Sequence, residues 1–323
     1  MLGALLALAS AATFGLNNAA VRRGVLTATV LQAMAITVPM GVPFFLLTCL
    51  LFGGFHALAG FSSSQWWWMA SAGMVHFIIG RYSNYRSIRA LGANLSSPIQ
   101  QLSVPISIIL AIIFLDEVIT PARVLGFILV MLGPTIMLKQ KKGAGPRKSK
   151  SGFEPHYAEG FLWGGVSALA YGASPLFIMM GLQSNPTIID SIPGGMISYS
   201  AATIVIITVI MILGGRSYMA GMGESAPKWF ALSGFIVFFS QIFRYMSLAV
   251  APVTVVVPIQ RLSPVFRVIF GWLINRDHEF FGFWVLFGIF LSMFGAILLA
   301  LSTDIVIALL PSSWAGFLQL SWP

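Results

Sequence analysis

Two copies of one short string contain the polar side chains that could bind a charged solute. Residues 98–103 read PIQQLS and residues 258–263 read PIQRLS, 160 positions later. The long polar side chains of the two strings, which are unusual inside an apolar run, are Gln100, Gln101, Gln260 and Arg261. An arginine offers a planar fork of donors that suits a carboxylate or a phosphate, and glutamine amides both donate and accept beside it. We therefore expect these residues to meet at one site for an anion.

The position of Arg261 leaves two interpretations open. It lies about nine residues into an apolar run, near the middle of a bilayer at 1.5 Å per residue. An arginine there costs roughly 2.5–3.5 kcal/mol to insert, so it needs a reason. It is either the anchor of an anionic substrate or a structural arginine bonded to carbonyls that Pro258 or Pro264 frees. Arg267 falls on another side of the same helix and is expected to serve packing or the lipid interface.

Other polar and aromatic residues lie inside or near the ends of apolar runs. Arg81 and Arg244 could line the mouths of the site, or they could extend toward lipid headgroups. His76 could take part in proton coupling, or it could be bonded to a neighbouring helix. Four aromatic residues could stack on a substrate or could pack between helices: Phe14, Tyr85, Tyr171 and Tyr245.

Acidic residues and cysteine restrict the chemistry further. All nine Asp and Glu residues fall near the ends of apolar runs or between them, which argues against a proton-coupled exporter of cationic drugs. The one cysteine, Cys49, leaves no disulfide framework and no thiolate metal site. Nucleophile, zinc and phosphate-loop motifs are absent, so we predict neither an enzyme, nor a metal site, nor a cofactor.

Composition indicates a membrane protein. Of 323 residues, 58% are hydrophobic and 8% are charged, whereas soluble domains have roughly a quarter charged residues. With about 20 apolar residues for each helical crossing, the sequence predicts an all-α membrane protein with ten transmembrane helices. The expected spans are 2–20, 28–52, 66–88, 93–115, 121–138, 159–181, 187–213, 228–250, 252–274 and 281–303.

Repeated residues divide the chain into two units. Tyr85 matches Tyr245 at the offset of 160, and Phe14-Gly15 matches Tyr171-Gly172 at 157. The expected units are a first five-helix repeat (1–138), a basic linker (139–157), a second five-helix repeat (158–303) and an apolar tail (304–323). Five spans per repeat invert the second unit in the membrane. We expect the tail to lie at the lipid interface.

Basic residues predict the orientation. In a ten-span chain the odd-numbered connections hold nearly all of them, and the even-numbered connections hold only Arg123. By the positive-inside rule the linker is then cytoplasmic and both termini face the other side. The residues concerned are Arg22, Arg23, Arg86, Arg89, Lys139, Lys141, Lys142, Arg147, Lys148, Lys150, Arg216, Lys228 and Arg276.

The same segments resemble the EamA family of the drug/metabolite transporter superfamily. The resemblance rests on residues 81–93, the proline-rich entry 98–105, the helix end 115–117, and Gly126 with Gly133. It implies a carrier of small metabolites built from two inverted five-helix repeats. Family members usually have both termini in the cytoplasm, which is opposite to the orientation that the basic residues predict. Residues 275–277 depart from the pattern of 115–117, so the two repeats have diverged.

Together these features predict a secondary transporter of small anionic or zwitterionic metabolites, such as amino acids or organic acids. It would work by alternating access between the two repeats. The expected partners are a small-molecule substrate and membrane lipids, without nucleic acid, and a homo-oligomer is left open. The expected location is the inner membrane of a bacterial cell. The alternative is a lipid scramblase or a non-catalytic membrane scaffold.

Overall fold

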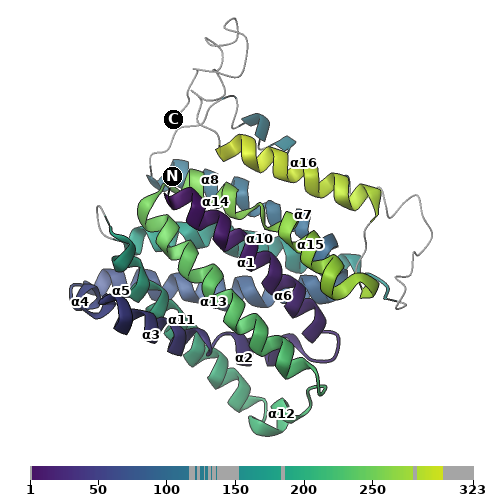
Figure 1. Ribbon diagram of the computed structural model, residues 1–323, viewed down its shortest axis with the longest axis horizontal. Coiled ribbons are helices and arrows are strands. Elements are labelled where there is room, and N and C mark those ends of the chain that lie inside the picture. The colour runs from purple at the N-terminus through teal and green to yellow at the C-terminus, as the bar shows by residue number, and fades with distance from the viewer. Residues whose placement is uncertain are drawn as a thin grey trace, which may run out of the picture.

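The computed structural model of this chain is a bundle of helices (Figure 1). It describes residues 2–115, 121, 124–126, 128, 129, 132, 136, 153–182, 186–278 and 282–300, and this part contains no strand. Several expectations lie outside these residues, among them the helix end at 116–117, Arg123, Gly133, most of the basic linker and the tail at 304–323.

The helices before the linker are α1 (Leu2–Gly24), α2 (Val30–Thr37), α3 (Gly41–Phe52), α4 (Gly54–Ala59), α5 (Ser63–Gly73), α6 (Arg81–Leu91), α7 (Ala93–Gln101) and α8 (Ser103–Leu115), with a π-helical segment (Met74–Gly80) that joins α5 to α6. After the linker follow α10 (Tyr157–Gly181), α11 (Ile188–Ile212), α12 (Arg216–Ala220), α13 (Ala226–Val250), α14 (Val253–Gln260), α15 (Ser263–Asn275) and α16 (Phe283–Ala300).

Six helical stretches are long and apolar enough to cross a membrane. They coincide with six of the ten expected spans: Leu2–Gly24, Val30–Phe52, Ala93–Phe114, Tyr157–Gly181, Ile188–Ile212 and Ala226–Val250. Of the other four, 66–88 falls on the polar stretch from α5 to α6, 252–274 on α14 and α15, and 281–303 on α16, while 121–138 lies mostly outside the described residues. The chain is a multi-pass integral membrane protein.

Side-chain caps fix where three helices begin. A serine or threonine accepts from a backbone N–H three residues on, and the side chain at that position returns a bond to the cap residue. The pairs are Thr29 with Gln32, Ser62 with Gln65, and Thr187 with Asp190. Exposed Trp66 and Trp67 follow the second of these starts, which agrees with aromatic rings at the lipid interface.

The first helix of each half packs against the other half. α1 lies along α13 and contacts α14 and α15, and α10 contacts α5, α6, α7 and α8; Figure 1 shows α1 and α13 side by side. Glycines permit the closest approaches. A Cβ on Gly15 would lie 2.9 Å from the Ser263 carbonyl oxygen, and one on Gly172 would lie 2.9 Å from the Ser103 carbonyl oxygen. The same contact therefore occurs twice, between residues that the repeat pairs.

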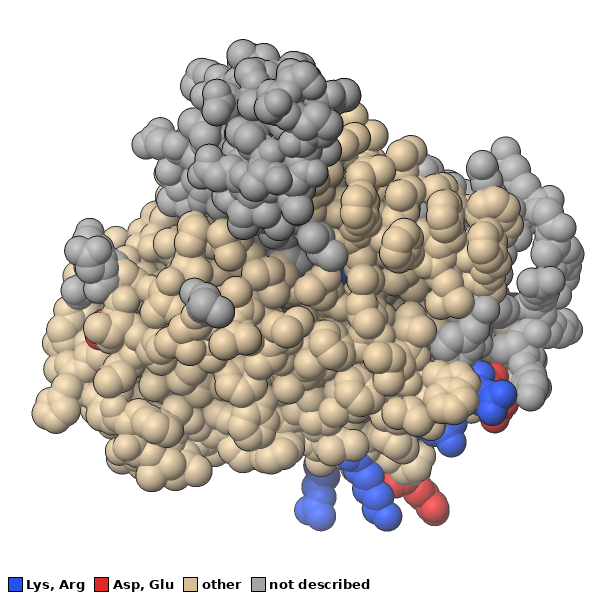
Figure 2. Space-filling view, turned by 45° about the horizontal axis from the view of Figure 1, so that its top comes forward, with Lys and Arg blue, Asp and Glu red and all other residues tan. Residues whose placement is uncertain are grey.

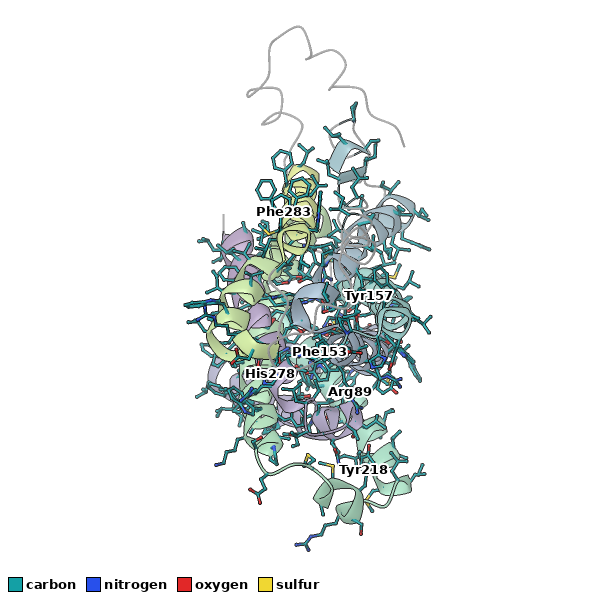
Figure 3. All side chains as sticks on the ribbon, turned by 90° about the vertical axis from the view of Figure 1, so that its right-hand side faces the viewer. Arg89, Phe153, Tyr157, Tyr218, His278 and Phe283 are labelled. Carbon is teal, nitrogen blue, oxygen red and sulfur yellow. The ribbon has the colours of Figure 1, made fainter. Side chains whose placement is uncertain are left out.

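Residues from all five odd-numbered connections of the expected ten-span chain meet at one end of the bundle. Buried Arg22 donates to the carbonyls of Ile88, Arg89 and His278, and its guanidinium lies 4.2 Å from the centre of the Phe153 ring. Figure 3 shows Arg89, Phe153 and His278 close together at this end. Tyr218 joins the group through a 2.7 Å hydrogen bond between its hydroxyl and that of Thr29.

Charged side chains gather at this end of the molecule. On the face shown in Figure 2, blue and red groups lie along one edge, and the remaining described surface is almost entirely uncharged. Burial, together with the positive charges of Arg23 and Arg22, lowers the pKa of His278 below its ordinary value. A concentration of positive charge at one end is the pattern of a cytoplasmic membrane face.

Candidate functional site

The two copies of the repeated string each interrupt a helix. α7 ends at Gln101 and α8 begins at Ser103, while α14 ends at Gln260 and α15 begins at Ser263. The spans expected at 93–115 and 252–274 are thus each two helices placed end to end. Pro105 and Pro264 explain the breaks, because each ring lacks an N–H and clashes with the carbonyl four residues earlier. Those carbonyls belong to Gln101 and Gln260.

The two breaks touch one another. The Gln101 side-chain amide donates a 2.7 Å hydrogen bond to the backbone carbonyl of Arg261, across the repeat offset of 160 residues. α14 packs against α8, and α15 packs against α7, so the two broken helices cross in opposite directions at their breaks. Interrupted helices are tolerated at membrane depth only where protein or a cavity satisfies the freed backbone groups.

A small cavity lies beside this crossing. Its volume is about 30 Å³, enough for about one water molecule. The wall is formed by α1, α10, α13, the π-helical segment and the end of α14 with the residue that follows it. The lining residues are Ser10, Phe14, His76, Tyr171, Ser240, Gln241, Arg244, Gln260 and Arg261.

Arg261 enters the cavity from the break itself. Its guanidinium lies 5.7 Å from the centre of the Tyr171 ring, and its Nε has no hydrogen-bond partner among the described residues. The alternative role was a bond to a carbonyl freed by Pro258 or Pro264, and among the described residues no hydrogen bond joins the Arg261 side chain to a carbonyl. The arginine fork therefore stays directed toward an aromatic ring and the cavity.

Arg244 reaches the same cavity from α13. It is 5% exposed, and its Nη2 donates a 3.0 Å hydrogen bond to the Ser174 hydroxyl. Its Nη1 lies 3.5 Å from the Gln241 amide oxygen. Both partners are neutral, so neither neutralises the charge of the guanidinium.

His76 completes the cationic and aromatic side of the cavity. The π-helical segment carries it, and π-helical turns occur frequently at functional sites. The imidazole packs 4.6 Å from Tyr171 between ring centres, and its Nδ1 has no partner among the described residues. No lining residue of the cavity is acidic. Among the described residues no group of three or more His, Cys, Asp or Glu side chains could hold a metal ion.

The structure brings together six of the residues selected from the sequence: Arg261, Gln260, Arg244, His76, Phe14 and Tyr171. Gln260 donates a 3.3 Å hydrogen bond to the Ser10 hydroxyl. Gln100 lies behind the cavity, where its amide donates to Asn84 and accepts a 3.0 Å hydrogen bond from Arg267. Arg267 also donates to the Ala93 carbonyl, which agrees with the packing role expected for it.

Arg81 and the two tyrosines are buried outside the cavity lining. Arg81 donates to the Thr37 carbonyl and, at 2.9 Å, to the Tyr199 hydroxyl. The Tyr245 hydroxyl is 2.7 Å from that of Ser198, and the Tyr85 hydroxyl has no partner in the described part of the chain. These contacts are those of helix packing.

The cavity also contains residues that were not selected as site residues: Ser10, Ser240 and Gln241. The sequence contains a signal for two of these three residues, Ser10 and Ser240. Ser10 precedes Phe14 by four positions, and Ser240 precedes Arg244 by four, so each hydroxyl shares a helix face with a residue that was already a candidate.

Comparison with known proteins supports the assignment of the first half. The model of the EamA-like transporter family matches residues 1–139. This segment is similar to that family, and the match stops short of the second half of the chain. This EamA segment contains the first copy of the repeated string, the break between α7 and α8, and two of the cavity residues on α1.

Two further matches extend the comparison. A protein named probable magnesium transporter NIPA2 from Arabidopsis thaliana is 30% identical over 124 residues, which are 38% of this chain. The match spans 34% of that relative's own length. A crystal structure of another protein aligns with 90% of this chain and 95% of its own, with a TM-score of 0.58 and 13% sequence identity. At this identity the alignment shows a shared fold, extending from the EamA segment into the second half.

Proposed function

We propose that the protein is a secondary transporter of small anionic or zwitterionic metabolites, and that the cavity at the two helix breaks is its substrate site. The observation that carries the proposal is the composition of the cavity: two guanidinium groups and an imidazole line it, and no carboxylate does. Arg261 is the anchor, with Arg244, Gln260 and His76 beside it. A role of His76 in proton coupling stays a prediction.

Ten transmembrane helices in two inverted five-helix repeats belong to the same proposal. Two pairs of equivalent contacts support it: the glycine contacts of α1 and α10, and the contacts of α14 with α8 and of α15 with α7. A hydrogen bond also joins Gln101 and Arg261, which are equivalent positions of the two repeats. Secondary transporters often bind substrate near the midplane, where interrupted helices from two repeats meet. Alternating access would then open the cavity first to one side and then to the other. Its location in a bacterial inner membrane stays a prediction.

Binding of an anion follows from the electrostatics of the cavity. Two buried positive groups with neutral partners repel one another strongly in a medium of low effective dielectric constant. A carboxylate or phosphate between them would accept charge-assisted hydrogen bonds, which are about twice as strong as neutral ones. Magnesium, named for the plant relative, prefers oxygen ligands and usually one or two carboxylates. The residues of this cavity do not offer such a set.

The alternative function is a lipid scramblase or a membrane scaffold without transport activity. A scaffold does not require a cavity at mid-membrane with charged walls, and such groups are costly there. The buried arginines therefore favour the transporter.

A thermal-stability screen tests the proposal. Purified full-length protein would be heated with anionic, zwitterionic and cationic metabolites, and Arg261→Gln would be treated in parallel. A ligand at a hundredfold excess over its Kd stabilises the folded state by about 2.7 kcal/mol. We expect anions or amino acids to raise the melting temperature of the native protein and to lose most of this effect in Arg261→Gln.

Exposed Arg216 on α12 provides the matched control. Arg216→Gln removes the same charge at a residue that does not line the cavity, so this variant should retain the full ligand effect. Stabilisation by cations alone, or an Arg261→Gln variant that responds as the native protein does, would show that this cavity is not an anion site. Saturable uptake of the stabilising solute into proteoliposomes would then separate a transporter from a scaffold.

A further inference from the structure

We infer that the cavity selects a compact substrate with two negative charges, either a short dicarboxylate or a phosphate monoester. This inference rests on the proposed function and narrows its substrate class. The proposed site requires one arginine anchor, but the structure provides two guanidinium groups at one small cavity. They come from different parts of the fold, Arg244 from α13 and Arg261 from the break after α14.

Both arginines have hydrogen-bond donors that their neighbours in the protein do not fully use. Arg244 uses Nη2 on the Ser174 hydroxyl and leaves Nη1 with only a long contact to Gln241. Arg261 is stacked against Tyr171 and has an unpartnered Nε within the described structure. Each guanidinium thus has donor capacity left and no acidic residue in the cavity wall to use it. A ligand with a single carboxylate would neutralise one of these charges, and a dianion would neutralise both.

A zwitterion fits the same wall less well. Its ammonium group would need a carboxylate or the open face of an aromatic ring. The cavity wall has no carboxylate, and the Tyr171 ring already contacts both the Arg261 guanidinium and the His76 imidazole. An ammonium would also lie beside two like charges. Amino acids without a second acidic group are therefore disfavoured relative to dianions.

Neutral polar groups line the rest of the cavity. Ser10, Ser240, Gln241 and Gln260 place hydroxyl and amide groups around the same space. Ser10 and Ser240 are bonded to one another and to each other's backbone carbonyls, so their hydroxyls are held by α1 and α13 together. At about 30 Å³ the cavity is smaller than any of these ligands, so binding requires the surrounding helices to move apart, as alternating access provides.

The test compares ligand pairs that differ in one charge. Detergent-purified full-length protein would be titrated with succinate and butyrate, with methyl phosphate and dimethyl phosphate, and with alanine. We expect the dianion of each pair to bind about 10- to 100-fold more tightly than the monoanion, since one more charged group gains hydrogen bonds of its own. Arg244→Gln and Arg261→Gln should each remove most of this preference.

Charge-retaining variants guard against loss of folding. Arg244→Lys and Arg261→Lys keep the positive charge, and they should keep part of the dianion preference even where the glutamine variants do not fold. Equal binding of succinate and butyrate, both dependent on Arg261, would overturn the dianion inference and leave the anion transporter intact. Tighter binding of alanine than of succinate would also overturn it. If no anion binds, or binding is independent of both arginines, the proposed function fails as well.

Discussion

Within the described part of the chain, the side chain of Gln101 makes a single hydrogen bond, which crosses the repeat offset. Its Nε2 donates to the carbonyl of Arg261 at 2.7 Å, while its Oε1 has no partner in the part of the chain that the structure describes. The residue is 1% exposed. Because the carbonyl of Arg261 lies in a helix break, the amide of Gln101 supplies a donor that regular helix would otherwise provide.

Replacement of Gln101 by leucine should therefore weaken the fold. The change leaves a buried carbonyl without a donor, at a cost of about 1–3 kcal/mol. Gln260→Leu removes a longer bond from a partly exposed residue and should cost less. Thermal unfolding can be followed with a thiol-reactive dye, because Cys49 is the one cysteine of the chain and is buried. Equal melting temperatures for Gln101→Leu and the native protein would show that the contact contributes nothing.

The types of residue at the site were easier to predict from the sequence than the directions in which their side chains point. The repeat and the midplane position selected Arg261 and Gln260, whereas Arg244 was expected near a span end, at the mouth of the site or extended toward the headgroups. The same reasoning placed Gln100 and Gln101 in the site, yet their amides bond to Asn84, Arg267 and the Arg261 backbone. Which way a side chain points depends on the helix breaks, and the spacing of polar residues in the sequence does not contain that geometry.

At the scale of elements, two glycine contacts hold the halves together. Each first helix approaches the interrupted helix of the other half so closely that a methyl group does not fit. Around Gly15 it would lie 2.6 Å from the Phe266 Cβ, and around Gly172 it would lie 2.6 Å from the Ile106 Cγ2. Small residues at helix interfaces permit this approach in membranes.

Alanine at either glycine should separate the helices and destabilise the protein. Overpacking of a close contact typically costs about 1–3 kcal/mol, so Gly15→Ala and Gly172→Ala should both lower the melting temperature. Gly165→Ala is the matched control in α10, because no atom lies within 4 Å of the added Cβ. It should be neutral or slightly stabilising, since alanine is the better helix former. A similar loss in all three variants would indicate a general glycine effect and contradict the contact model.

Apolar length predicted six spans well and was less informative for the interrupted ones. Pro105 and Pro264 were visible in the sequence, but a run of apolar residues has the same length whether its helix is whole or broken. The stretch from α5 to α6 reads as polar because it contains His76, Arg81 and Arg86. Its charges are satisfied by neighbours far along the chain, Arg81 by Tyr199 and Arg86 by Glu159, which hydropathy does not detect.

The distribution of charge over the whole molecule predicts its orientation. Arg22 joins the connections after α1, α6 and α15 at one end, and Tyr218 adds the connection after α11. We expect this end to face the cytoplasm, because positive charges are retained on that side during insertion. The opposite orientation is the one usual for the family that the chain resembles.

Cysteine labelling of intact cells distinguishes the two orientations. In a Cys49→Ser background, Ser217→Cys reports the basic end and Ser64→Cys reports the opposite end, since both serines are exposed. A membrane-impermeant maleimide should label Ser64→Cys in intact cells and Ser217→Cys only after permeabilisation. The reverse pattern would mean that the positive-inside rule fails here and that the termini are cytoplasmic.

The whole fold was predictable in class but not in its exchange of helices between halves. Repeated residues in the sequence indicated two units, and the boundaries at 138 and 158 stay a prediction. That α1 would leave its own unit and pack with α13, α14 and α15 was not indicated by any repeat. A repeat reports which residues are equivalent, and it does not report which copy each residue contacts.

The polar face of α1 has a consequence for the synthesis of the chain. Ser10 bonds to Ser240, Asn17 accepts from Ser233, and Arg22 donates to His278, all more than 200 positions later. Because α1 leaves the ribosome before α13, it enters the bilayer with hydroxyl, amide and guanidinium groups whose partners in the second half have not yet been translated. Insertion machinery or lipid headgroups must shield those groups until the helices of the second half arrive. A truncated chain that stops before α13 would expose them permanently, and cellular quality control would have a clear signal for its removal.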